Sequence, residues 1–91
     1  MTYSVYMVRC ADATLYTGIA RDVTRRIAEH NGLTPTGKPS AARTGAAYTA
    51  ARRPVELVYV TEAATRSEAQ KEEARLKRLS RAEKLRLIGA F

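Results

Sequence analysis

The sequence is poor in cysteine and has no long run of apolar residues. Cys10 is the only cysteine among the 91 residues, which excludes an internal disulfide and a four-cysteine zinc site. No apolar stretch approaches the roughly 18 residues that a membrane-spanning helix requires, and the N-terminus lacks the basic start and apolar core of a signal peptide. We therefore expect a protein of the reducing cytoplasm that has no membrane partner.

The length of the chain predicts a single domain over residues 1–91. A domain of this size buries a modest core and has a small margin of stability, and it leaves no room for a large cofactor. Hydrophobic residues make up 45% of the sequence, which is ordinary for a globular protein.

The charge of the chain is strongly positive. Sixteen Lys and Arg residues stand against nine Asp and Glu, which gives a formal net charge of +7. This balance favours a phosphate-rich partner, most simply nucleic acid, over a protein that is merely basic and soluble. A membrane surface is disfavoured, because no basic amphipathic segment carries large apolar residues at interfacial spacing.

The first thirty residues predict a hairpin followed by a helix. Alternation of apolar and polar residues predicts a strand over residues 3–9, a turn over 10–14 and a return strand over 15–19. Asp22 predicts the N-cap of a helix, because its carboxylate can accept a free backbone N–H. The helix is expected to end at His30, before an Asn-Gly pair.

The rest of the chain predicts one more strand and two more helices. Residues 31–49 show no periodicity and indicate a long basic loop, and residues 55–61 predict a strand at the centre of the sheet. Capping boxes predict helices that begin after Thr65 and after Ser80. The order β-β-α-β-α-α predicts an α+β, two-layer fold in which helices pack on a small three-stranded mixed sheet.

The helix after the third strand carries a carboxylate where an apolar residue is expected. Helical periodicity places either Glu72 or Glu73 in the middle of the stripe that packs on the sheet. A carboxylate there is costly unless a positive or polar group meets it. The candidates are Lys77, Arg26 or a metal ion. The alternative is a boundary residue whose carboxylate extends to solvent.

Two tyrosine-containing segments of the predicted hairpin resemble the motifs of a known family. "SVY" and "YTG" place Tyr6 and Tyr16 ten residues apart and resemble the paired motifs of the GIY-YIG nuclease superfamily. Arg26, His30 and Glu73 fall at the spacing of that family's arginine, histidine and glutamate. We expect these three residues and the two tyrosines to share one side of the sheet. The segments "AAYTAARRPVELVYV" and "EEARLKRLSRAEKLRLI" further resemble the small stand-alone bacterial members of the family.

The two motifs depart from the family pattern at three positions. Ser4 and Val5 stand where the family has Gly-Ile, and Thr17 stands where it has isoleucine. Both tyrosines and Gly18 are retained, so we expect the chemistry to be retained. We expect Gly18 to let the backbone approach the sheet edge or a substrate closely.

The resemblance implies a divalent-metal-dependent endonuclease that hydrolyses phosphodiester bonds of nucleic acid, DNA in preference to RNA, by in-line attack of water. It implies that Glu73 binds one Mg²⁺ or Mn²⁺ ion and that Arg26 contacts the phosphate. It points to Tyr16 or Tyr6 as the group that accepts the proton; we favour Tyr16, with Tyr6 binding water or phosphate and His30 orienting or sharing the proton. These residue types suit such chemistry, since Mg²⁺ takes one or two carboxylates together with substrate phosphate.

A tyrosine can act as a base near neutral pH only if its pKa lies well below the usual value of about 10. Nearby positive charge favours the ionised phenol. We therefore expect Arg26, Lys77 and the bound ion to lower the pKa of the tyrosine that accepts the proton.

Basic residues in and after the long loop are expected to contact phosphate groups of the nucleic acid. Tyr48 and Thr49, which precede an Arg-Arg pair, are assigned to the same surface. The basic residues in this set, with one from the helix that follows the third strand, are Lys38, Arg43, Arg52, Arg53 and Lys77.

Each candidate site residue also has a purely structural interpretation. Tyr6 and Tyr16 suit the edge of a core, His30 suits the C-terminal end of a helix, and Arg26 suits a solvated helix face. The sequence therefore also allows a non-catalytic nucleic-acid-binding module with a steep salt dependence. A third hypothesis is an adaptor for a larger protein partner. The chain itself is expected to be a monomer or a weak dimer.

Overall fold

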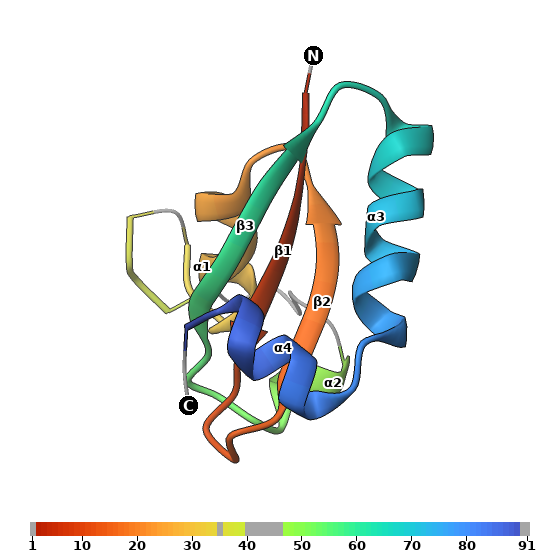
Figure 1. The fold of residues 1–91 in the computed structure, drawn as a ribbon. Coiled ribbons are helices and arrows are strands. Elements are labelled where there is room, and N and C mark those ends of the chain that lie inside the picture. Colours follow the sequence, from red (N-terminus) through yellow and green to blue (C-terminus); the bar gives the residue numbers. More distant parts are fainter. Residues whose placement is uncertain (1, 35, 40–46, 90–91) are drawn as a thin grey trace.

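A computed structural model describes residues 2–34, 36–39 and 47–89 of the chain. In these residues the strands β1 (Tyr3–Arg9), β2 (Leu15–Ala20) and β3 (Glu56–Ala63) form one sheet. Four helices surround it, as Figure 1 shows. They are α1 (Val23–His30), α2 (Ala47–Ala50), α3 (Arg66–Arg78) and α4 (Arg81–Leu87).

The sheet is antiparallel throughout and has the strand order β2-β1-β3. The α+β fold with helices on a three-stranded sheet is confirmed, but the expectation of a mixed sheet is wrong. The expectation that the third strand is central is also wrong, because β1 occupies the centre. The apolar residues of β3 suggested a central strand, yet Leu57 and Val60 are 40% and 46% exposed. They lie on a part of the sheet that α1 does not cover.

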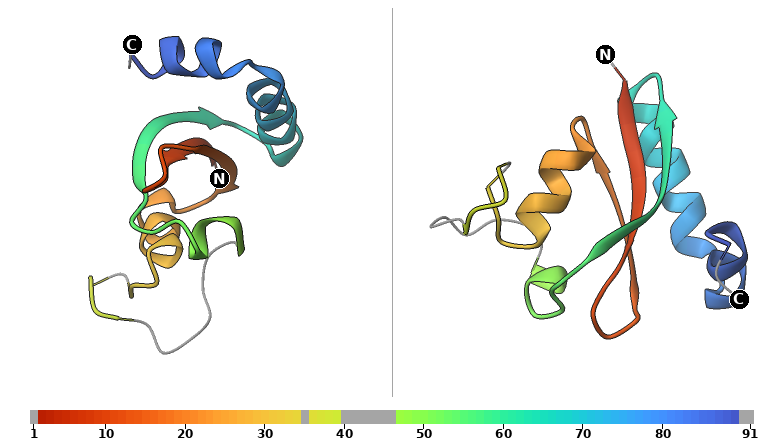
Figure 2. Two further views of the ribbon diagram at one scale, coloured as in Figure 1. Left: turned by 90° about the horizontal axis from the view of Figure 1, so that it is seen from below. Right: turned by 90° about the vertical axis from the view of Figure 1, so that its left-hand side faces the viewer.

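Helices cover both faces of the sheet, so the sheet is the middle of three layers and not one of two. On one face α1 packs on a cluster that includes Tyr6 and Val8. On the other face α3 packs with Ala69 and Leu76 against Val5. Successive strand residues point to opposite faces, which is why Val5 and Tyr6 belong to different clusters. The view from below in Figure 2 shows α1 and α2 on one side and α3 and α4 on the other.

The helix starts follow the local rules that predicted them. The Asp22 carboxylate accepts a hydrogen bond from the Arg25 backbone N–H at 3.0 Å. Ser80 and Glu83 form a reciprocal capping box. The Thr65 hydroxyl caps α3, but the matching Glu68 carboxylate accepts from the backbone N–H of residue 64 and not from that of Thr65. Caps involve neighbours within four residues, so the sequence alone determines them.

Helix α2 begins within residues 31–49, which were expected to form a loop, and ends one residue beyond them. Its four residues are too few for a periodic pattern, and so short a helix is stable only through tertiary packing. None of the helices in the described part of the chain is long and apolar enough to cross a membrane.

Candidate active site

The register of the hairpin places both motif tyrosines on the face that α1 covers. Tyr6 pairs with Gly18, and Tyr16 pairs with Val8. Directly opposed residues of an antiparallel pair point to the same face, and Tyr6 and Val8 share a face because they are two positions apart. The expectation that the two phenols lie on one side of the sheet is confirmed.

Gly18 leaves room for the ring of Tyr6. A Cβ atom at this position would lie 2.6 Å from the Tyr6 hydroxyl oxygen and 2.8 Å from Cζ. Tyr6 is only 1% exposed, so its ring has little freedom to move aside. The close approach expected at this glycine is therefore that of a side chain of the protein itself.

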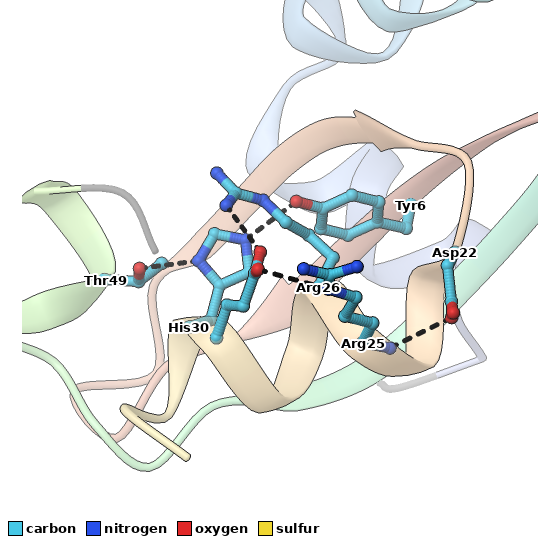
Figure 3. Close-up of polar contacts among 7 residues, drawn as sticks. Tyr6, Asp22, Arg25, Arg26, His30 and Thr49 are labelled. Carbon is cyan, nitrogen blue, oxygen red and sulfur yellow. Dashed lines mark hydrogen bonds and ion pairs between the residues drawn. The ribbon is translucent and has the colours of Figure 1, made fainter. Parts of the chain in front are cut away.

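His30 is the last residue of α1 and is completely buried. Its Nε2 atom lies 2.7 Å from the Tyr6 hydroxyl, and its Nδ1 atom lies 2.7 Å from the Thr49 hydroxyl (Figure 3). Thr49 is also completely buried, so it does not lie on the phosphate-binding surface to which it was assigned. Tyr6, His30 and Thr49 form a chain of hydrogen bonds that we call the buried relay.

The C-terminal end of α1 is anchored next to this relay. Arg53 donates from Nε to the His30 carbonyl oxygen at 2.6 Å. The amide of Asn31 donates to the Val55 carbonyl and accepts from the Val55 backbone N–H, at 3.0 and 2.7 Å. These contacts join the helix to the start of β3 and fix the position of the imidazole.

Burial sets the protonation states of the relay. Desolvation, with the positive charges of Arg26 and Arg53, lowers the pKa of His30 to about 4, against the opposing charge of Glu29. Burial also raises the pKa of Tyr6 above its usual value, although Arg26 beside the phenol opposes the shift. Arg26 acts on the Tyr6 pKa in the expected direction, but burial outweighs it and the net shift is upward. A neutral imidazole therefore faces a protonated phenol at neutral pH.

Arg26 lies one helical turn before His30 and brings a positive charge to the phenol of Tyr6. Its guanidinium donates to the Glu29 carboxylate at 3.1 Å and also interacts with the Tyr6 hydroxyl. The side chain is 32% exposed, so the guanidinium connects the buried relay with solvent. A permanently charged fork in this position is suited to a phosphate group.

Tyr16 contacts the buried relay through its aromatic ring. Its ring meets the His30 ring edge-on at 5.4 Å between centroids, and it stacks on the Tyr48 ring at 5.7 Å. The Arg52 guanidinium lies over Tyr48, 4.0 Å from the ring centroid. Aromatic and cation–π contacts thus connect the hairpin with α2.

Glu73 comes from the opposite side of the sheet. Glu72 and Glu73 both lie between the buried residues Ala69 and Leu76 of α3, with side chains 28% and 26% exposed, so burial does not decide between them. The expectation that Glu73 shares a sheet face with the tyrosines is wrong, because α3 covers the other face. Its charge nevertheless contributes to the raised pKa of Tyr6. The expected partner Lys77 is confirmed, with 3.4 Å between Nζ and the carboxylate.

The residues present fit a metal ion only as a site with one protein carboxylate. No group of three or more His, Cys, Asp or Glu residues gathers in the described ranges. The Glu73 side chain is 26% exposed, so its carboxylate is accessible. Mg²⁺ is commonly held by one or two carboxylates, with water and substrate phosphate as the other ligands, and Glu73 fits that arrangement.

Most of the basic residues that were predicted to contact phosphate form contacts within the chain instead. Arg52 pairs with Asp12 at 3.0 Å, Arg53 binds the His30 carbonyl, and Lys77 pairs with Glu73. Lys38 is exposed, and Arg43 lies outside the described residues. Thr49 is the relay member whose role the sequence reasoning missed, because α2 has no periodic pattern to show which side chain points inward.

Comparison with known proteins gives the family. The family model described as the GIY-YIG catalytic domain matches residues 2–86. The chain belongs to the GIY-YIG family. This GIY-YIG chain is 50% identical over 86 residues to a UPF0213 protein of Desulfotalea psychrophila. The match covers 94% of this chain and 70% of that protein. A UPF0213 protein of Staphylococcus epidermidis is 48% identical over 84 residues, with 92% and 90% covered.

A solved structure supports the same relationship. The solution NMR structure of a UPF0213 protein from Bacillus halodurans matches the GIY-YIG chain with a TM-score of 0.56 and 34% sequence identity. The match covers 98% of this chain and 84% of that one. The sequence resemblance to the small bacterial members of the GIY-YIG superfamily is confirmed.

Proposed function

We propose that this GIY-YIG protein is a divalent-metal-dependent endonuclease that hydrolyses phosphodiester bonds of nucleic acid, with DNA as its first candidate substrate. The observation that carries the proposal is the convergence on one hydroxyl, that of Tyr6. His30 binds it directly, Arg26 interacts with it, and the charge of Glu73 acts on it from the other face of the sheet. The net charge of +7 suits a polyanionic substrate.

The proton of the attacking water passes to the relay. Tyr6 takes it at its hydroxyl oxygen while His30, which is neutral at physiological pH, accepts the phenol proton at Nε2. Because the two transfers occur together, no free phenolate has to form, although burial raises the pKa of Tyr6. This moves the base role from Tyr16, our assignment from the sequence, to Tyr6. What supports the change is the 2.7 Å hydrogen bond from Tyr6 to His30, in contrast to the edge contact made by Tyr16.

Arg26 binds the scissile phosphate. Its guanidinium keeps its charge at all relevant pH values and can donate two parallel hydrogen bonds to phosphate oxygens as negative charge develops. Glu29 holds the guanidinium in place before substrate arrives. The partial exposure of the Arg26 side chain leaves it accessible to a polymer too large to enter a closed pocket.

Glu73 would hold the divalent ion, Mg²⁺ or Mn²⁺. When bound, such an ion neutralises phosphate charge and stabilises the leaving oxygen. Lys77 pairs with the Glu73 carboxylate in the free protein. Because the carboxylate is on α3 and the relay is on α1 and β1, the complete site depends on both layers that cover the sheet.

A cleavage assay tests this proposal. Wild type, Glu73→Gln and the matched control Glu72→Gln are incubated with labelled single-stranded, duplex and branched DNA and with RNA, in Mg²⁺, Mn²⁺ or chelator. We expect cleavage by wild type and by Glu72→Gln that requires the ion. We expect Glu73→Gln to lose at least about 100-fold in rate, in line with the effect of losing an electrostatic stabiliser at a reacting centre.

Two outcomes would overturn parts of the proposal. If Glu73→Gln cuts as fast as wild type, the assignment of Glu73 is wrong. If wild type binds every substrate with a steep salt dependence but cuts none, the protein is a non-catalytic nucleic-acid-binding module.

A further inference from the structure

Thr49 is a buried polar residue to which the family resemblance assigns no role. It is completely buried, and its hydroxyl lies 2.7 Å from Nδ1 of His30. Buried hydroxyl groups are costly unless they are hydrogen-bonded, so its partner matters for the position of α2. The hydroxyl meets the imidazole on the side away from Tyr6, as Figure 3 shows.

Helix α2 is held over His30 by contacts with the hairpin. The Tyr48 ring stacks on the Tyr16 ring. Arg52 donates to the Tyr48 carbonyl at 2.8 Å and to the Asp12 carboxylate at 3.0 Å. The Arg52 guanidinium also covers the Tyr48 ring. These contacts place Thr49 at the end of the buried relay, although four residues of helix would not hold it there alone.

The donors and acceptors around Tyr6 decide which nitrogen of His30 carries the proton. The Arg26 guanidinium lies beside the Tyr6 hydroxyl (Figure 3), and an arginine has only donors to offer, so the lone pairs of the Tyr6 oxygen face Arg26. The single phenol proton then goes to His30 Nε2, which must be unprotonated to accept it. A neutral imidazole has one N–H, so this N–H is on Nδ1, where the Thr49 hydroxyl accepts it.

We propose that Thr49 is a positioning residue that fixes His30 in the Nδ1–H tautomer, with the lone pair of Nε2 directed at Tyr6. The proposal deepens the proposed function and rests on it for its catalytic consequence. Without this acceptor, the Nε2–H tautomer of the buried imidazole would be favoured, because the Tyr6 oxygen could accept its N–H. The phenol would then meet a donor, and the relay could not take its proton.

The test uses two variants of Thr49 and one control. Thr49→Val removes the hydroxyl at nearly constant shape, and Thr49→Ser keeps it. The control Thr61→Val removes a hydroxyl from β3 on the other face of the sheet, where Thr61 pairs with Val5. All are compared with wild type, without an affinity tag that contains histidine.

The first readout is the tautomer of His30, measured by imidazole ¹⁵N NMR. His30 is the only histidine of the chain, so its signals need no assignment against others. We expect one tautomer, Nδ1–H, in wild type, Thr49→Ser and Thr61→Val, and a mixture or the Nε2–H tautomer in Thr49→Val. This readout does not require nuclease activity, so it remains decisive even if no substrate is found.

The second readout is cleavage. We expect Thr49→Val to lower kcat about tenfold or more, because a relay in the wrong tautomer loses much of its acid–base contribution. KM should stay within about twofold, because Thr49 does not reach the substrate, and Thr49→Ser should restore kcat.

Specific results would overturn the proposal. An Nε2–H tautomer in wild type would refute it, and that measurement holds even if Thr49→Val fails to fold. A folded Thr49→Val that keeps both the wild-type tautomer and the wild-type kcat would also refute it. A changed tautomer together with unchanged kcat would show that Thr49 positions His30 but that the relay is not the base of the proposed nuclease.

Discussion

The two faces of the sheet are built from different kinds of interaction. On the α3 face the fully buried residues Val5, Ala69 and Leu76 are apolar. On the α1 face three of the most buried side chains, Tyr6, His30 and Thr49, carry polar atoms. Within the described residues no buried side-chain nitrogen or oxygen lacks a hydrogen-bond partner.

The α3 face contributes mainly to stability, whereas the α1 face fixes one arrangement of its side chains. Apolar packing on the α3 face stabilises the fold without demanding one orientation of each group. A buried polar chain is acceptable only in the geometry that satisfies every member. The α1 face therefore holds His30 and Tyr6 in a single arrangement, as a site for proton transfer requires.

The largest effect on stability should come from breaking the α3 face. Leu76→Ala removes a fully buried side chain and should lower the free energy of unfolding by about 2–5 kcal/mol. Ile27→Ala, which truncates a half-buried residue of α1, should cost less. Urea unfolding of both variants checks this order, and an equal or larger loss for Ile27→Ala would contradict it.

Lowering the pH should destabilise the fold, because it favours protonation of His30 on the α1 face. The unfolded imidazole binds a proton below pH 6.5, whereas burial delays protonation in the fold to about pH 4. Stability should therefore be complete above pH 6.5 and fall by about 3 kcal/mol as the pH drops to about 4. His30→Gln should lack this part of the loss. The free energy of unfolding of wild type and of His30→Gln, measured across this pH range, tests the prediction. An equal decrease with falling pH in both proteins would contradict it.

Gly18→Ala should disturb the α1 face alone. The new Cβ would lie 2.6 Å from the Tyr6 hydroxyl oxygen, so the ring must shift and its bond to His30 must lengthen. We expect a loss of about 1–3 kcal/mol, typical of an overpacked core, and a loss of cleavage activity that is larger than the loss of folded protein. Wild-type activity in a variant of wild-type stability would be the contrary result.

The smallest effect should come from the exposed contact that supports α2. Asp12→Asn weakens the ion pair between Asp12 and Arg52. The Asp12 side chain is 45% exposed and the Arg52 side chain is 34% exposed. Pairs between partly exposed side chains contribute little, so stability should hardly change. Because the pair helps to place Thr49, kcat should fall by less than in Thr49→Val. Thermal unfolding and cleavage rates of the two variants at low and high salt test this ranking.

Much of the candidate site could be predicted from the sequence. The spacing of Tyr6, Tyr16, Arg26 and His30, together with the family resemblance, predicted that these four side chains meet, and the hairpin register of the structure brings the two tyrosines onto one face. The apolar stripe indicated Glu72 or Glu73, and the family resemblance selected Glu73. Its approach from the opposite face could not be predicted, because the side on which α3 packs depends on the path of the chain after β3.

The sequence by itself determined the hairpin and the helix starts, since each depends on neighbours a few positions away. Only the tertiary structure decided the strand order, the burial of Thr49 beneath α2 and the direction of the Tyr6 pKa shift. Those features depend on how much water is excluded when distant segments pack. Charges can be counted from a sequence, but the desolvation that outweighs them at Tyr6 arises only in the folded chain.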